Sequence, residues 1–345
     1  MNFFDLVTSS NIVAYWLERD LNNVKVGDQL FPFKKEIGLS LDWIKGAHNQ
    51  VVGLKLAAFD SKAIRRDRQG LEKVQTEMPF FKESKVIDEK LRQELNTLLQ
   101  TQNEQLIRQI IAKVFDDVVE LIKAAYETVE RVRMQLLTTG TITLASNGQA
   151  YSYDYGMPQA NKITVSTAWS NSAADPIKDI TDTQDLARTK GVILTRAMCN
   201  TACLNALLNN TAIKNRLYVL AQGNITITRD EVRKYIEQQT GIVIYVNDNG
   251  YVAEDGTFTK YFADDVFVLM PDGPLGYTHF GTTPEESDLM SGATKAEVSL
   301  VNNSVAVTTV KEEDPVNVMT KVSMIMLPSF EQADNVYILD VNPSN

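Results

Sequence analysis

A long amphipathic pattern between residues 104 and 137 constrains this chain more than any other feature. Apolar side chains recur there every three or four positions, at an average of about 3.6, which is the period of one helix face. These positions are Ile107, Ile111, Val114, Val118, Ile122, Ala125, Val129, Val132 and Leu136. The charged residues between them predict a solvated opposite face: Lys113, Asp116, Asp117, Glu120, Lys123, Glu127, Glu130 and Arg133.

The helical run is expected to extend further toward the N-terminus. Pro79 is the only Gly or Pro between Gly70 and Gly140, so the helix could begin near Ile87. About fifty helical residues would span roughly 75 Å, which is long for a domain in a chain of this size. Such a helix is typical of a strut, and it favours a part of a shell or filament over an enzyme.

Composition excludes several classes of protein. The chain has 345 residues, of which 44% are hydrophobic and 23% charged, so a sizeable core is expected. Its net charge of −10 argues against sequence-independent binding of nucleic acid, which needs an excess of Lys and Arg. We find neither a signal peptide nor an apolar run long enough to span a membrane, and we expect a protein that is soluble in the cytosol when made.

The first 86 residues contain little that could form a core. Residues 1–28 are expected to form an arm with a short amphipathic piece from Leu6 to Leu21. Residues 29–86 contain strand-like runs at 37–44 and 51–59, joined by a polar turn at 45–50. An isolated pair of strands is marginally stable in water, so this excursion needs a neighbour, and another subunit is the natural one.

The rest of the chain alternates between strand and helix signals. A hairpin is predicted around Asn147-Gly148, followed by a strand at 162–166. Asp175-Pro176 begins a helix that Gly191 ends, and Thr228 with Glu231 forms a capping box. Between and after these signals we expect a strand at 192–194, a helix at 201–220, a hairpin from 242–246 to 257–262, and strands at 298–310, 322–327 and 336–341.

The sequence carries no convincing active site. Neither a P-loop nor a dinucleotide-binding glycine motif is present, and no G-x-S-x-G occurs. His48 and His279 stand in unrelated contexts and are expected to be structural, and Cys199 and Cys203 are expected to be reduced core thiols. Residues 247–250 resemble a calcium loop only superficially, because Gly256 occupies the position of the bidentate Glu. We therefore expect no catalysis, no cofactor and no metal.

Two stretches carry a resemblance to a known family. The first is Thr167-Ala168-Trp169-Ser170, then Asp175-Pro176 and Asp179-Ile180, which resembles the W-S … D-P-x-x-D-I signature of lambda-type major capsid proteins of tailed phages. The second runs from Val266 to Pro271 and continues through Gly273, Leu275-Gly276, Gly281 and Thr283-Pro284-Glu285-Glu286. It is similar to a strand and Gly-rich loop of the same family, the major capsid protein E family, and the two stretches agree in order and spacing.

The resemblance implies an α+β fold of the HK97 capsid type. In that fold residues 1–28 would form the N-terminal arm, 29–86 the extended β-loop, and 87–175 the peripheral domain with the long spine helix and the β-hairpin. The α/β axial domain would occupy 176–284, and residues 285–345 would supply returning strands. The implied function is the icosahedral head shell around the double-stranded DNA genome of a tailed phage.

The same resemblance implies the partners. These are copies of the chain in hexamers and pentamers, a portal protein, packaged DNA without sequence-specific binding, and in some phages a decoration protein. The chain shows no coiled-coil N-terminal extension, so we expect a separate scaffolding protein or a removed prodomain. The location would be the virion capsid, and the host cytoplasm during assembly.

Six residues of the excursion are candidate intersubunit contacts, since interfaces favour aromatic, apolar and Arg anchors. They are Trp43, Ile44, Leu54, Arg65, Arg66 and Arg68. Local packing of the first three and a solvated face for the arginines is an equally open alternative. Asp175 and Asp179 are interpreted as a helix cap and a first-turn acid rather than contacts.

The sequence is compatible with three other functions. An encapsulin-like compartment would share the fold, and a cytosolic α/β enzyme would need a catalytic constellation that the sequence lacks. A monomeric binding module would leave the excursion unpacked.

Overall fold

The computed structural model describes residues 7–19, 25–45, 72–87, 89–100, 104–217, 227–292, 296–313 and 316–343. The chain divides into two compact units, each made of three separate segments. The first unit comprises Met1–Asp42, Gln75–Val132 and Tyr277–Ser329, and the second comprises Trp43–Val74, Arg133–Gly276 and Phe330–Asn345. The mixture of helices and strands confirms the predicted α+β class.

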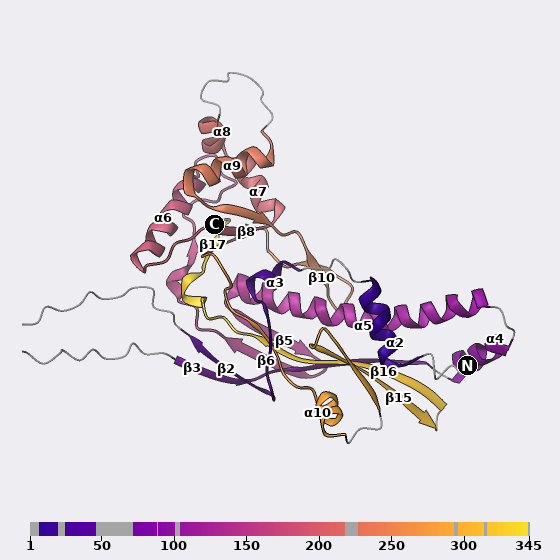
Figure 1. Cartoon of the computed structure of the whole chain (residues 1–345). Helices are drawn as coiled ribbons and strands as arrows, with labels where there is room; N and C mark the ends of the chain where they lie inside the picture. Colours follow the sequence, from indigo (N-terminus) through magenta and orange to yellow (C-terminus); the bar gives the residue numbers. More distant parts are fainter. Residues whose placement is uncertain are drawn as a thin grey trace, which may run out of the picture. The chain divides into compact units, whose positions relative to one another are not determined.

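A six-stranded sheet forms the centre of the first unit. Its strands are β1 (Phe33–Lys35), β13 (Thr278–Phe280), β16 (Val316–Pro328), β15 (Val305–Glu313), β14 (Glu297–Val301) and β4 (Phe80–Ile87). The order is β1-β13-β16-β15-β14, and β4 pairs with β16 beyond the end of β13. Only the β1–β13 pair is parallel. The long strand β16 therefore connects all parts of this sheet, as its course beside β15 shows (Figure 1).

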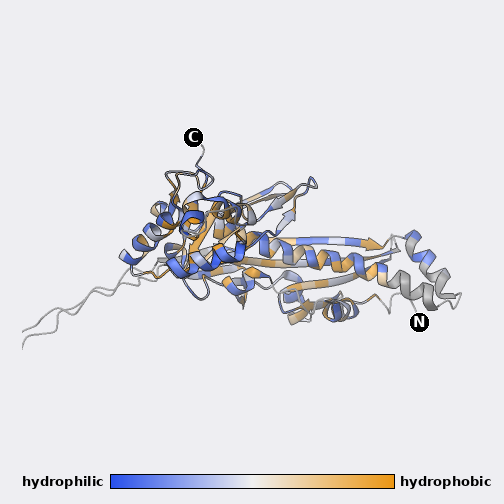
Figure 2. Ribbon diagram, turned by 90° about the horizontal axis from the view of Figure 1, so that it is seen from above, coloured by the Kyte–Doolittle hydropathy of each residue, from blue (hydrophilic) through white to orange (hydrophobic). Residues whose placement is uncertain are grey.

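The amphipathic pattern of the sequence is the helix α5 (Glu104–Thr139). All the predicted apolar-face residues from Val114 to Leu136 are buried, which confirms that face of the helix. The side chains of Ile107 and Ile111 are not among those that the structure describes. Hydrophilic and hydrophobic residues alternate along this helix in Figure 2. The predicted solvated face is wrong at Glu130 and Arg133, which are 3% and 4% exposed. One reason is visible at Glu130, whose Oε1 accepts a hydrogen bond from the backbone N–H of Gly27 at 3.0 Å.

The N-terminal amphipathic piece is the helix α2 (Ser9–Arg19), and α3 (Val26–Leu30) follows it. The ring of Trp16 stacks on Tyr126 of α5, with centroids 5.8 Å apart. Tyr15 donates a hydrogen bond to Asp116 at 2.8 Å, which fixes a second point along the same helix. The predicted arm therefore packs on its own spine helix within the first unit.

The prediction of one helix from Ile87 is wrong, because Ile87 is the last residue of β4 and pairs with Val318. Helix α4 (Glu89–Gln100) precedes α5, and residues 101–103 between them lie outside the description. The sequence misled here because residues 80–87 contain no Gly or Pro to mark a strand. Strand β2 (Ser40–Lys45) pairs with β3 (Glu72–Glu77), while β1 and β4 at the two ends of the predicted excursion belong to the six-stranded sheet. The predicted partner strand at 51–59 lies outside the described residues, so the excursion stays a prediction.

The second unit contains a five-stranded sheet in the order β7-β17-β12-β8-β9. These strands are β7 (Lys162–Thr164), β17 (Tyr337–Asp340), β12 (Val266–Met270), β8 (Arg196–Cys199) and β9 (Val243–Val246). Its helices are α6 (Pro176–Thr189), α7 (Thr201–Asn209), α8 (Thr211–Leu217) and α9 (Arg229–Thr240). A single apolar core joins the helices to one face of the sheet, and it includes Trp169, Ile180, Leu204, Ile236 and Phe267.

Several local predictions in this unit are confirmed. Asp175 caps α6, Thr228 and Glu231 form the capping box of α9, and Gly241 ends α9 in the left-handed conformation at φ 71°. Asn147 and Gly148, at φ 49° and 72°, turn the hairpin of β5 (Thr141–Ser146) and β6 (Gln149–Asp154). The described part of this unit also contains the 3₁₀ turns η1 (Gln159–Asn161) and, just before β17, η2 (Ala333–Asn335).

Two strand predictions and one helix prediction are corrected. Residues 192–194 are not a strand, because Val192 N–H bonds back to Ala187 at the end of α6; the strand is β8, two residues later. The segment 242–246 does not pair with 257–262: β9 pairs with β8, and the hairpin is β10 (Gly250–Val252) with β11 (Phe258–Lys260). The helix at 201–220 is interrupted at Asn210, which separates α7 from α8.

Among the described residues, no helix is both long and apolar enough to cross a membrane. The same residues contain no cluster of three or more His, Cys, Asp or Glu side chains arranged to hold a metal ion. Cys199 and Cys203 are both free and buried.

Candidate functional site

The first signature stretch of the sequence forms a fixed structure in the second unit. Trp169 is completely buried, and its indole Nε1 donates a hydrogen bond to Asp179 Oδ2 at 2.9 Å. Its ring meets Phe267 of β12 edge-on, with centroids 5.1 Å apart. Burial raises the pKa of Asp179, although the indole N–H bond opposes that rise. The signature Trp and the first-turn acid of α6 are therefore one packing unit.

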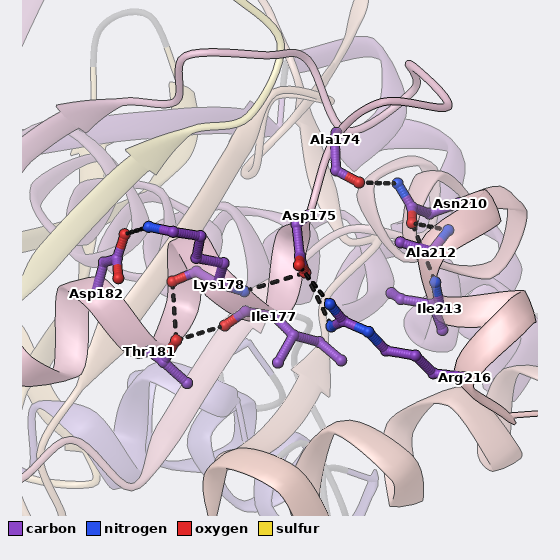
Figure 3. A network of polar contacts seen from close by, with 10 residues as sticks. All are labelled: Ala174, Asp175, Ile177, Lys178, Thr181, Asp182, Asn210, Ala212, Ile213 and Arg216. Carbon is purple, nitrogen blue, oxygen red and sulfur yellow. Dashed lines mark hydrogen bonds and ion pairs between the residues drawn. The ribbon is translucent and has the colours of Figure 1, made fainter.

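Asp175, the second signature residue, joins two helices (Figure 3). Its Oδ1 accepts a hydrogen bond from Lys178 N–H at 3.3 Å and another from Arg216 Nη1 of α8 at 3.0 Å. Burial alone would raise the pKa of Asp175, but the bonds from Arg216 and the helix N-terminus outweigh it and hold the pKa below its usual value. The cap is thus also the attachment point of α8.

Asn210 belongs to the same network, although no motif of the sequence marked it. Asn210 is buried, with only 3% of its surface exposed. Its Oδ1 accepts from the N–H groups of Ala212 and Ile213 at 2.9 and 3.2 Å, and its Nδ2 donates to Ala174 O at 3.2 Å (Figure 3). An Asn directly before a helix is a cap signal, so that part of its role was visible in the sequence. The hydrogen bond from Asn210 to Ala174, just before Asp175, could not be predicted from the sequence.

We expect Asp175→Ala to lower the free energy of unfolding of the second unit by about 1 kcal/mol, since it removes a helix cap. The ion pair with Arg216 adds little because both side chains are substantially exposed, at 44% and 33%. Chemical denaturation of the purified protein measures the change. Asp182→Ala is the matched control: Asp182 pairs with Lys178 on the exposed face of α6, and its loss is expected to leave the free energy of unfolding almost unchanged. Equal effects of the two variants would contradict the capping role.

The second signature stretch anchors the helix α10 (Pro284–Ser291) to the sheet of the first unit. Thr283 caps the helix by accepting a hydrogen bond from Glu286 N–H at 3.2 Å. The side chain of Glu286 is 3% exposed and pairs with Lys35 of β1 at 2.7 Å. The neighbouring Glu285 pairs with Lys321 of β16 and accepts from Ser323 Oγ at 3.0 Å. The adjacent glutamates therefore attach one helix to two strands.

These pairs predict that acid destabilises the first unit. Burial of Glu285 would raise its pKa, but the bonds from Lys321 and Ser323 outweigh burial and lower the pKa. A carboxylate with a lowered pKa stabilises the fold at pH values above its unfolded pKa, and that contribution is lost as the pH falls through the folded pKa. Lys321→Met is expected to raise the pKa of Glu285 and to move acid unfolding to higher pH.

The measurement is the unfolding temperature by circular dichroism between pH 7 and pH 3. Lys123→Met, which removes an exposed lysine of α5, is the control and is expected to leave the acid transition in place. If both variants shift the transition equally, the effect comes from net charge and not from the Glu285 pair.

His279 lies at the middle of a buried polar cluster in the first unit. Its Nδ1 is 3.0 Å from Glu36 Oε1, and its Nε2 is 3.0 Å from Ser329 Oγ. Burial lowers the pKa of His279, while Glu36 opposes the change. The order Ser–His–Glu is that of a nucleophile, a base and an orienting acid. Ser329 is completely buried, however, and its hydroxyl also bonds to Tyr277 O, so the arrangement joins strands, as the structural interpretation of His279 predicted.

The predicted intersubunit contacts fall mostly outside the described residues. Leu54, Arg65, Arg66 and Arg68 lie within residues 46–71, and the side chain of Ile44 is also not described. Trp43 is 5% exposed within the single chain, where its ring packs on Tyr155 at 5.5 Å. That packing fits the local alternative and leaves little of the Trp43 ring for a neighbour. The contact role of all six residues stays a prediction.

The signature residues described above cap helices, fill cores and join strands. The long helix α5 and the two sheets that they support are those of an HK97-type capsid fold. The family model of phage major capsid protein E matches residues 14–341, so the chain belongs to that family. It is a virion shell protein that assembles with copies of itself, as the sequence resemblance implied.

Solved structures agree with this assignment at the level of the fold. The chain is similar to a protein assigned as the capsid protein of a prophage in Escherichia coli CFT073, with a TM-score of 0.60 and 15% identity over 97% of this chain and 99% of that one. It is also similar to a phage-related protein from Bordetella bronchiseptica RB50, with a TM-score of 0.55 and 14% identity over 97% of both chains. No curated protein sequence matches significantly.

Proposed function

We propose that this chain forms the hexamers and pentamers of the icosahedral head of a tailed phage, and that the closed shell encloses the double-stranded DNA genome. The observation that carries the proposal is the match to phage major capsid protein E along residues 14–341, because it includes both units and not one motif. The subunits would assemble in the host cytoplasm with a separate scaffolding protein and a portal protein. A decoration protein is a further expected partner of the outer surface.

The charge of the chain suits a container for DNA. A net charge of −10 means that the wall as a whole does not attract phosphate, so packaged DNA would be held without sequence-specific or strong nonspecific binding. A protein that instead bound DNA tightly would oppose the movement of the genome through the portal. The acidic composition therefore supports an enclosing role rather than a condensing one.

The chain is proposed to have no catalytic activity. The best arrangement for a nucleophile among the described residues is Ser329 with His279, and Ser329 is completely buried. A substrate could reach the hydroxyl of Ser329 only if β13 separated from β16, the strand that ends just before Ser329. The cluster instead holds the sheet of the first unit together.

The contacts between subunits are proposed to include the excursion that begins at β2. Trp43 would orient this excursion through its packing on Tyr155, and Ile44 and Leu54 would meet the neighbour directly. Arg65, Arg66 and Arg68 would pair with carboxylates of that neighbour. Because Trp43 is buried in its own chain, Trp43→Asp would damage folding as well as assembly, so it is a poor test of the contact.

Electron microscopy of the purified protein tests the proposal. The chain is produced with and without its neighbouring phage genes and separated on a sucrose gradient. Closed shells, or capsomers that close when a scaffold is added, would support the head-shell function, and DNA inside particles made with the packaging genes would distinguish it from an encapsulin-like compartment. Uniform small particles under every condition would contradict it.

A further inference from the structure

Residues 37–39 of the first unit form a bend that presents an apolar side chain fully to solvent. Ile37 is 97% exposed, and Leu39 in the same bend is 47% exposed. Single exposed apolar side chains are common on protein surfaces, so the exposure of Ile37 alone does not mark a contact. Two of them on one bend form a small apolar patch, and the backbone of the bend decides whether that patch is a fixed feature.

Hydrogen bonds hold the backbone of this bend in place, so the exposure of Ile37 does not reflect a flexible segment. Its backbone is bound at three points: Glu36 N–H to Phe280 O at 2.8 Å, Thr282 N–H to Gly38 O at 3.1 Å, and Met78 N–H to Leu39 O at 2.9 Å. Gly38 at φ 100° provides a conformation that other residues avoid. A side chain held out by a fixed backbone loses little freedom on binding, which is a property of preorganised contact residues.

The charges around the bend are already paired within the chain. Lys34 is 3.0 Å from Glu36, and Lys35 is 2.7 Å from Glu286. The bend thus offers the apolar side chains of Ile37 and Leu39 beside charges that pair with each other, which fits the apolar core of a protein interface and does not fit nucleic acid.

We propose that Ile37 inserts into an apolar site on a second copy of this chain, and that it fixes the direction in which the following strand β2 leaves its own subunit. This inference rests on the proposed function, because the occupant is the neighbour in the shell. The argument for a second copy is that this chain assembles with copies of itself, and that β2 leads directly from the bend into the excursion proposed to cross to a neighbour. One neighbour would then receive both the bend and the excursion.

The test uses Ile37→Cys in the full chain. Cys199 and Cys203 are 0% and 1% exposed, so the introduced thiol is the one that a maleimide dye labels quickly. We expect labelling in assembled particles to be at least about tenfold slower than in free subunits, because the centre of an interface excludes water. Ile193→Cys, at a position of the second unit that is 71% exposed, is the matched control and calibrates the labelling of an exposed isoleucine position in both preparations.

A second variant separates packing from folding. Ile37→Asp is expected to keep the unfolding temperature of the wild type and to lose particle formation, whereas Ile37→Met is expected to keep both. Equal labelling of Ile37→Cys in subunits and particles would overturn the inference while the shell function stands. Protection only in particles that still hold scaffolding protein would overturn it too, since the occupant would be that protein. A wild-type chain that never assembles would overturn both.

Discussion

Trp169→Ala is expected to unfold the second unit or leave it close to unfolding, with a loss of about 3–5 kcal/mol in the free energy of unfolding. Trp169 is completely buried, packs edge-on against Phe267 and donates to Asp179. The substitution removes the largest side chain of this core and leaves the partly buried carboxylate of Asp179 without its indole donor. Denaturant unfolding followed by circular dichroism measures the loss, and assembly is expected to fail with it.

Trp169→Phe separates the contributions of ring packing and hydrogen bond. The phenyl ring keeps much of the contact with Phe267, so the expected loss is smaller, about 1–3 kcal/mol, and comes mostly from the unpaired Asp179. The pKa of Asp179, already raised by burial, is expected to rise further. A Trp169→Ala protein as stable as the wild type would contradict the assignment of this signature residue to the core.

Gly281→Ala is expected to destabilise the first unit by about 1–3 kcal/mol, because the added methyl group has no space. A Cβ at this position would lie 2.6 Å from Gly38 O, 2.8 Å from Met78 Cε and 2.9 Å from Ile325 Cγ2. Met78 can move, but the Gly38 carbonyl belongs to the bend at residues 37–39 and cannot retreat without loss of its bond from Thr282. Thermal unfolding by differential scanning calorimetry measures the effect.

Gly273→Ala is the comparison for this variant. A Cβ added at Gly273 would meet no other atom within 4 Å. The destabilisation by Gly273→Ala therefore comes only from its φ of 82°, which residues with a side chain avoid. The steric explanation predicts that a further substitution, Gly281→Ser, is at least as harmful as Gly281→Ala, whereas Gly273→Ser resembles Gly273→Ala. A Gly281→Ala protein with an unchanged unfolding temperature would show that the bend yields, and would weaken the case for a rigid contact at Ile37.

The sequence predicted those features that depend on neighbours along the chain. The spacing of Val114, Val118 and Ile122 predicted the buried face of α5, and Asn147-Gly148 predicted a hairpin turn. The cap of α6 at Asp175 and the capping box at Thr228 were also visible, since each needs only the residues of one helix turn. Local chemistry determines these elements whatever lies around them.

The features that the sequence missed depend on distant partners. Glu130 has the spacing of a solvated residue and is buried because Gly27 donates to it. Residues 242–246 are compatible with a hairpin, but β9 pairs with β8 instead, and no local signal distinguishes the two. At the candidate site, the family motif marked Trp169 and Asp175, whereas Asn210 and Arg216 were missed because their bonds join segments about forty residues apart.

The order of the strands has a consequence for when this protein can meet its neighbours. In the second unit β17, the last strand along the chain, lies between β7 and β12, so the sheet has a gap until Tyr337–Asp340 has been synthesised. The first unit likewise waits for β16, which joins β4, β13 and β15. Neither unit can complete its sheet before its late strand has been synthesised, so the finished surface that meets a neighbour forms only after both β16 and β17 are in place.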